Sequence, residues 1–94
     1  MTYPISPESR PTRHEDLWLR ESGDETVLLD KEHDRMHVLN ETALALWQLC
    51  DGETTVEEMV TAAAGLFDAD RARLQSDVII ALNDMHDRHL IDLA

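Results

Sequence analysis

The spacing of apolar residues changes near residue 40, and this change constrains the fold more than any other feature of the sequence. Before residue 40, short apolar clusters rich in Leu and Val recur about every ten residues, with turn-forming residues such as Gly23 and Asp34 between them. Such clusters are typical of antiparallel strands joined by hairpins. We therefore predict a three-stranded antiparallel meander built from Leu17–Leu19, Val27–Leu29 and Met36–Leu39.

After residue 40 the apolar residues recur about every 3.6 positions, the period of an α-helix. Asn40 is a suitable N-cap for a first helix, and Gly52 can end that helix because glycine adopts the left-handed conformation without strain. Thr55 and Glu58 have the spacing of a capping box, which predicts the start of a second helix. The predicted core-facing residues of these helices are Leu39, Ala43, Leu46, Trp47 and Cys50, then Val56, Met59, Val60, Ala63 and Phe67.

A third helix is predicted from a cap at Asp68 or Asp70 to about His89, with Leu74, Val78, Ala81, Leu82 and Met85 on its apolar face. Leu90, Ile91 and Leu93 then form a short apolar tail that closes the core or adds a small strand. The predicted fold class is α+β, with a three-stranded antiparallel meander followed by three helices. This order describes a winged helix-turn-helix shape.

The chain is long enough for one domain but not for two independent cores, since it has 94 residues. Its hydrophobic content of 43% excludes disorder along the whole length. Residues 1–12 contain all three prolines and little that can be buried. We therefore expect a flexible N-terminal tail over residues 1–12 and a folded domain over residues 13–94.

The net charge of −12 disfavours nucleic acid and anionic membranes as partners. Winged helix-turn-helix domains often bind DNA, but residues 41–94 hold eleven acidic residues and only three arginines. No apolar run approaches the roughly 20 residues of a membrane-spanning helix. Because the single cysteine, Cys50, cannot form an internal disulfide, we expect a cytoplasmic protein.

Residues for catalysis or metal binding are not grouped in the sequence. Cys50 lies on the predicted buried face of the first helix, where a thiol is usually inert. His86 and His89 have a spacing that places two ligands on adjacent helical turns, but no third ligand accompanies them. His37 is predicted on the opposite sheet face from Met36 and Val38, where it packs or titrates. We therefore predict neither an enzyme, nor a cofactor, nor a metal site.

The third predicted strand, residues 35–39, offers a different possibility. A meander pairs this strand on one side only, so its other side presents unpaired N–H and C=O groups. If the third helix runs beside that edge, the two form a groove that suits an extended peptide. Two other occupants of the edge remain open at this stage, namely the C-terminal tail of the chain and a second copy of the chain.

The sequence resembles the PqqD family, whose members are known as RiPP recognition elements. The resemblance covers about residues 14–93, and its most specific parts are Leu39-Asn40-x-Thr42-Ala43 and Asp51-Gly52-x-x-Thr55-Val56. Further matching segments are Val27–Asp30, Met36–Leu39, Asp77–Val78 and Leu90–Ile91. The resemblance implies a non-catalytic chaperone that binds the leader of a ribosomally made precursor peptide as an added strand. It also implies a partner that modifies the peptide, such as a radical S-adenosylmethionine (radical SAM) enzyme or a lasso-type protease and cyclase.

Carried over to this chain, the resemblance places the peptide between the third strand and the third helix. The implied peptide-binding residues are Arg35, Met36, His37, Val38 and Leu39 on the strand, and Leu74, Asp77, Val78 and Ala81 on the helix. Ala81 is small where relatives often look larger, which suggests a pocket for a bulky side chain. The helical period leaves open whether the flank with Arg73 and Ile80 or the flank with Ile79 and His86 faces the groove.

Two alternative functions belong to other classes. In one, the chain is a structural subunit that homodimerises through the edge of the third strand, whereas the peptide-binding function predicts a monomer or a weak homodimer. In the other, which the charge disfavours, it is a DNA-binding winged-helix regulator.

Overall fold

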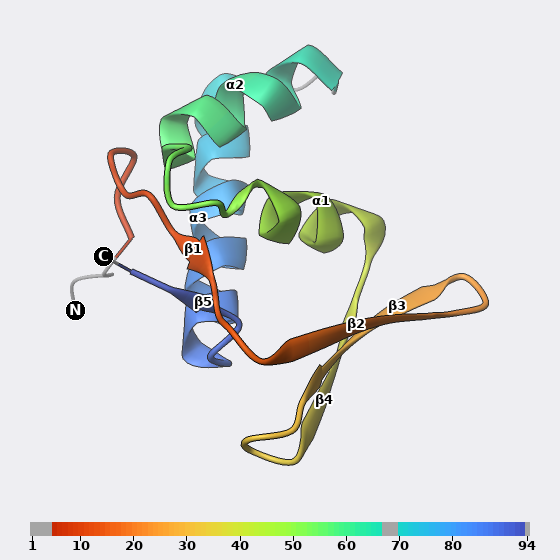
Figure 1. Cartoon of the computed structure of the whole chain (residues 1–94). Helices are drawn as coiled ribbons and strands as arrows, with labels where there is room; N and C mark the ends of the chain where they lie inside the picture. Colours follow the sequence, from red (N-terminus) through yellow and green to blue (C-terminus); the bar gives the residue numbers. More distant parts are fainter. Residues whose placement is uncertain (1–4, 67–69, 94) are drawn as a thin grey trace.

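The computed structural model describes residues 5–66 and 70–93, which form a small sheet beside three helices (Figure 1). The elements in chain order are β1 (Thr12–Arg13), β2 (Leu17–Ser22), β3 (Glu25–Asp30), β4 (Arg35–Leu39), α1 (Glu41–Leu49), α2 (Val56–Leu66), α3 (Arg71–Asp87) and β5 (Ile91–Asp92). The α+β fold with a three-stranded meander before three helices is therefore confirmed. In Figure 1 the meander projects away from the helices.

Strands β2, β3 and β4 form one antiparallel sheet in that order. The loop between β2 and β3 has two residues, and its first, Gly23, has a φ of 62°. A positive φ at this position is that of a type II′ turn, whose twist matches the flanking strands. In the longer β3–β4 loop Asp34 has a φ of 51°. The two turn signals read from the sequence thus correspond to the two hairpins.

The helix N-termini are capped largely as the sequence predicts. The Ala43 N–H donates to Asn40 Oδ1 at 2.7 Å at the start of α1. At the start of α2 the Glu58 N–H donates to Thr55 Oγ1 at 3.1 Å and the Thr55 N–H donates to Glu58 Oε1 at 2.9 Å, which completes a capping box. Asp70 occupies the N-cap of α3 without a side-chain hydrogen bond. The alternative cap, Asp68, lies outside the described residues.

The end of α1 differs from the prediction. The helix ends at Leu49 with Cys50 as its C-cap, so Gly52 lies two residues beyond the cap. Gly52 still has a φ of 81°, and a Cβ atom at this position would lie 2.8 Å from Thr12 Oγ1. Glycine is therefore required here because the β1 backbone approaches closely, as well as by its left-handed conformation.

The N-terminal segment corrects the prediction of a flexible tail over residues 1–12. Ile5 is only 4% exposed and belongs to the core. The carbonyls of Pro7 and Ser9 accept hydrogen bonds from the Glu57 and Val56 N–H groups, each at 3.0 Å. These N–H groups lie in the first turn of α2 and have no partner within the helix, so the extended segment satisfies them. Packing thus begins before residue 13, and residues 1–4 lie outside the described residues.

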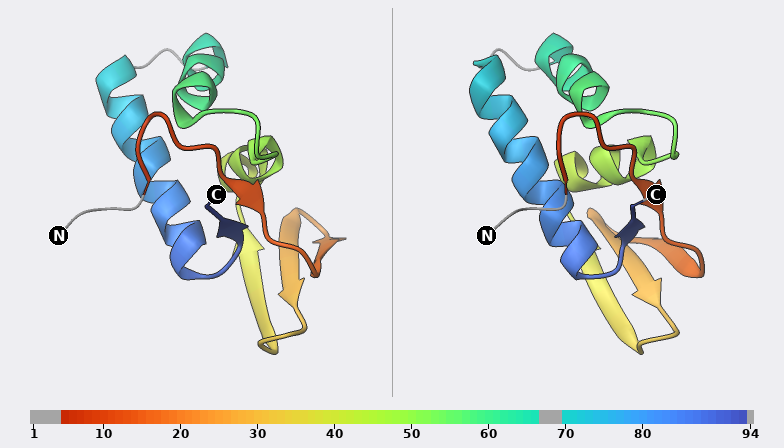
Figure 2. Two further views of the ribbon diagram at one scale, coloured as in Figure 1. Left: turned by 60° about the vertical axis from the view of Figure 1, so that its left-hand side comes forward. Right: turned by 90° about the vertical axis from the view of Figure 1, so that its left-hand side faces the viewer.

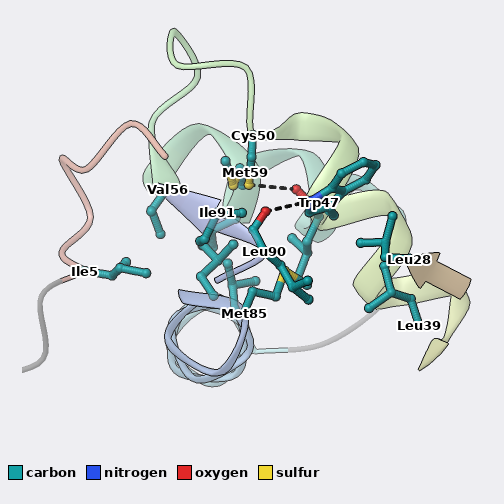
Figure 3. Close-up of a cluster of buried hydrophobic side chains, with 14 residues drawn as sticks. Ile5, Leu28, Leu39, Trp47, Cys50, Val56, Met59, Met85, Leu90 and Ile91 are labelled. Carbon is teal, nitrogen blue, oxygen red and sulfur yellow. Dashed lines mark hydrogen bonds between the residues drawn. The ribbon is translucent and has the colours of Figure 1, made fainter. Parts of the chain in front are cut away.

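The core lies between the helices and the inner face of the sheet (Figure 3). Trp47 anchors it, since its Nε1–H donates to the Leu90 carbonyl at 3.0 Å. Cys50 is fully buried, and this burial raises the pKa of its thiol to about 12, which disfavours the reactive thiolate. Among the described residues, no helix has the length and apolar character needed to cross a membrane.

Candidate functional site

Strand β4 is an edge of the sheet, and its outer side is free in the part of the chain that the structure describes. The C-terminal strand β5 does not occupy it. Instead β5 pairs antiparallel with β1, with Thr12 opposite Asp92 and Arg13 opposite Ile91. The expected possibility that the C-terminal tail fills the edge of β4 is therefore wrong for residues 91–92. The partner of β5 is therefore β1, which begins at Thr12, inside the segment that the sequence predicted to be a flexible tail.

The register of the sheet identifies the backbone groups that point outward from β4. Ser22 and Glu25 flank the two-residue loop, and such a closing pair exchanges both of its hydrogen bonds. Bonded and non-bonded pairs alternate along each strand, so Leu28 directs its backbone groups to its partner His37 in β4. The backbone N–H and C=O groups of Met36 and Val38 therefore point toward the free edge.

A groove of about 270 Å³ lies beside this edge, between β4 and the C-terminal half of α3. The right-hand view of Figure 2 shows the two elements side by side. The groove combines apolar side chains with three polar ones, Asn40, Asp84 and Arg88. The lining residues are Val38, Leu39, Asn40, Ala43, Ala81, Asp84, Met85, Arg88 and Leu90.

The β3–β4 loop contacts the residue that follows α3 and thereby helps to set the width of the groove. Asp30 is 2% exposed, and its carboxylate accepts a hydrogen bond from His33 Nδ1 at 2.8 Å. Burial opposes the ionisation of Asp30, but the hydrogen bonds from His33 outweigh it and lower the pKa. The His33 ring in turn stacks on His89 with 5.3 Å between ring centroids. This chain of contacts ties the β4 hairpin to the C-terminal end of α3.

Two polar groups lie near the groove. Arg88 Nε lies 3.3 Å from Asp84 Oδ2, an exposed pair one helical turn apart. His37 points to the inner side of the sheet, and its Nε2 is buried without a hydrogen-bond partner among the described residues. Burial, followed by the charge of Arg88, lowers the pKa of His37. The His37 ring is therefore neutral near pH 7.

Asp30, Glu32 and His33 bring three metal-ligand atoms within 4.8 Å of one another. The closest contact in this group is the hydrogen bond between His33 and Asp30, which already explains its geometry. His86 and His89, the pair considered from the sequence, are not part of it.

The structure brings together only some of the residues predicted for the site. Val38, Leu39 and Ala81 line the groove. Arg35, Met36 and His37 belong to β4 but are not part of the lining. Leu74 and Val78 contact the hydrophobic core instead, and Asp77 is exposed, with its Oδ2 4.0 Å from Arg73 Nε, and does not line the groove.

The groove uses the C-terminal half of α3, whereas the prediction selected mainly its N-terminal half. The N-terminal half lies beside α2 (Figure 2), and its residues Leu74 and Val78 serve the core rather than a ligand. Asp84, Met85 and Arg88 were missed, although they follow Ala81 at the i+3, i+4 and i+7 positions of the same helical face. Asp84 also lies one turn after Ile80, so the groove is nearer to the flank of α3 that carries Ile80 than to the flank with Ile79 and His86, but Ile80 itself does not line it.

Comparison with known proteins agrees with this geometry. The profile of the family described as coenzyme PQQ synthesis protein D (PqqD) matches residues 25–91. A PqqA binding protein of Rhodopseudomonas palustris strain TIE-1 is 36% identical over 86 residues, which cover 89% of this chain and 82% of the relative. The chain belongs to the PqqD family. A PqqA binding protein of Xanthomonas axonopodis pv. citri is 32% identical and aligns over 95% of this chain and 97% of its own.

Two solved structures share the fold of this PqqD-family chain. The solution structure of the PqqD truncation of Methylobacterium extorquens PqqCD, described as a stand-alone RiPP recognition element, has a TM-score of 0.78 and 25% identity, with 96% of each chain covered. TbiB1 in complex with the TbiA(beta) leader peptide has a TM-score of 0.75 and 21% identity, with 86% of this chain and 94% of TbiB1 covered. The latter likeness concerns the fold.

Proposed function

We propose that this PqqD-family chain is a peptide-binding adaptor. It binds the leader segment of a ribosomally synthesised precursor peptide by strand addition to β4 and presents the peptide to a modifying enzyme. The observation that carries the proposal is the free edge of β4 with the groove beside it. Relatives that carry the name PqqA binding protein support the same role.

The site provides two kinds of contact. Met36 and Val38 direct two N–H and two C=O groups outward, which hold an extended backbone of almost any sequence. Side chains alternate along a strand, so every second residue of the bound peptide enters the groove. There Leu39, Ala81 and Met85 contact an apolar side chain. Backbone pairing thus provides affinity and the groove provides selectivity.

The proposed role requires a partner enzyme and no chemistry by the chain itself. We propose a radical SAM enzyme, or a lasso-type protease and cyclase, as the recipient of the bound peptide in the cytoplasm. The proposed site contains no pair of a nucleophile and a base, since its lining is apolar apart from Asn40, Asp84 and Arg88. No cofactor is needed for such a role.

Titration of the isotopically labelled chain with the leader of the precursor peptide encoded beside it tests the proposal. We expect amide chemical-shift changes concentrated in residues 35–40 and 81–90, with little change in residues 56–66 of α2. An unperturbed β4 would contradict strand addition. Light scattering of the same samples checks the homodimer alternative, because a stable dimer that added peptide leaves unchanged would favour that alternative.

A further inference from the structure

The face of the sheet that points away from the helices is apolar and exposed, and apart from Val38 at its β4 edge it does not line the proposed peptide groove. Residues opposite each other in the register share a face, and two rows cross this one. The rows are Trp18–Leu29–Met36 and Arg20–Val27–Val38, and together they define the outer face. Trp18, Met36 and Val38 are 49%, 66% and 53% exposed. A contiguous apolar patch of this kind marks an interaction surface.

The outer face also differs in charge from the rest of the chain. Arg20 lies beside Val27 in its row, and Lys31 Nζ lies 3.7 Å from the centroid of the Trp18 ring. These are two of only eight basic residues in a chain with twenty acidic ones. The outer face therefore has an apolar centre with two cations, Arg20 and Lys31, at its border, and Glu25 shares this face only beside the β2–β3 turn.

We propose that the outer face is the docking surface for the modifying enzyme, which meets it with an apolar patch bordered by carboxylates. This inference rests on the proposed function, because it concerns the partner to which the peptide is delivered. A second copy of the chain is a poor occupant. A twofold contact between two outer faces brings Arg20 and Lys31 of both copies into one interface, where like charges repel.

Peptide binding changes this surface. A strand added to β4 extends the sheet, and those of its side chains that do not enter the groove lie on the outer face beside Met36 and Val38. The complete docking surface is therefore formed by the chain and the peptide together. The enzyme accordingly binds the peptide-loaded chain more tightly than the free chain.

The test measures the Kd of the purified modifying enzyme encoded beside this chain, with and without the leader. We expect Arg20→Glu and Trp18→Ser each to raise that Kd about tenfold, because they remove a border charge and the central ring. Arg73→Glu is the matched control, since it makes the same charge reversal on the exposed surface of α3, away from the outer face. The leader's own Kd is expected to be unchanged in all three variants.

The inference is overturned if both outer-face variants bind the enzyme as the wild type does, or if Arg73→Glu weakens binding equally. The inference is also overturned if the leader binds the chain but does not lower the Kd of the enzyme. Failure of the proposed function looks different, because the wild-type chain then fails to bind the leader. In that case the variants are still compared for binding of the free chain to the enzyme, with circular dichroism as the check of folding.

Discussion

The sheet has two outer edges, β2 and β4, and they differ in their surroundings. Neither is paired on its outer side within residues 5–66 and 70–93. On β2, residues 18–22 are all exposed. On β4, the edge borders the groove whose far wall is α3. Both edges thus offer the same kinds of backbone group, and β4 also has a lined groove beside it that can receive side chains.

This difference shows why a free edge alone does not define a binding site. Backbone hydrogen bonds are individually modest, with a net contribution of about 1 kcal/mol each, because they replace bonds to water. An edge without a neighbouring wall gives weak pairing without selectivity. Burial of a side chain between β4 and α3 adds the apolar contribution that distinguishes one peptide from another. Proposals about β4 can therefore be tested by making the same change at β2.

The largest expected effect comes from proline substitution in the two edges. The same alternation that turns Val38 outward on β4 also turns Leu19 outward on β2, so neither N–H belongs to the ladder. Proline is tolerated at such edge positions. Val38→Pro removes a backbone N–H that faces the leader. We expect the leader's Kd to rise at least about tenfold, which corresponds to a loss of about 1.4 kcal/mol of binding free energy. Leu19→Pro is expected to leave the Kd unchanged, as measured by calorimetry.

An equal loss of affinity in both variants would show that proline acts through the sheet as a whole. Preserved affinity in Val38→Pro would contradict strand addition at β4. His37→Pro serves as a stability control, since its N–H faces β3 and proline there removes a ladder bond. This variant should lower the free energy of unfolding, whereas Val38→Pro should not.

The next effect concerns the wall of the groove. Ala81 lines the groove and is half-buried, whereas its neighbour Ile80 is 62% exposed and is not part of the lining. Ala81→Phe fills the groove and is expected to raise the leader's Kd by roughly fivefold to tenfold, because the displaced side chain loses its apolar contacts. Ile80→Phe adds an aromatic ring one residue away and should leave the Kd within about twofold. Equal affinities in the two variants would show that the leader does not enter the groove.

Much of the fold could be predicted from the sequence because its signals are local. A two-residue turn at Gly23, a cap at Asn40 and a capping box at Thr55 and Glu58 each act over a few residues, and all three are found in the structure. The role of residues 5–12 could not be predicted in this way. Their proline-rich composition resembles a tail, and the hydrogen bonds that hold them to the domain, accepted by the carbonyls of Pro7, Ser9 and Pro11, come from residues more than 40 positions away.

The candidate site shows the same division between local and distant information. The free edge of β4 follows from the order of the strands, so Val38 and Leu39 were identified. Which turns of α3 line the groove depends on where α2 packs, and the periodicity of the sequence does not predict that packing. Leu74 and Val78 share an apolar face with Ala81, and only the packing of the helices shows that they serve the core while Ala81 serves the groove.

The smallest expected effect concerns the β1–β5 pair, which keeps the C-terminal strand away from the free edge of β4. His14 Nδ1 lies 2.9 Å from Asp92 Oδ2 and joins these two strands. The hydrogen bond to Asp92, opposed by burial, raises the pKa of His14 above its usual 6.5. The folded state then holds the proton more tightly than the unfolded state. The contribution of the His14–Asp92 pair to the free energy of unfolding is complete below about pH 6.5 and is lost as the pH rises through the raised pKa of His14.

His14→Asn isolates this contribution. His37 affects stability in the opposite direction. Its pKa is lowered in the folded state, so its protonation destabilises the folded chain as the pH falls below 6.5. The pH dependence of the wild type therefore combines both histidines, and the difference between wild type and His14→Asn is the informative quantity. Denaturant unfolding at about pH 5.5 and about pH 8 should show a difference of about 0.5 kcal/mol at the lower pH that disappears at the higher one, as for a partly exposed ion pair. A difference that does not change with pH would assign His14 a packing role, and the strands β1 and β5 would then be held together by their backbone pairing alone.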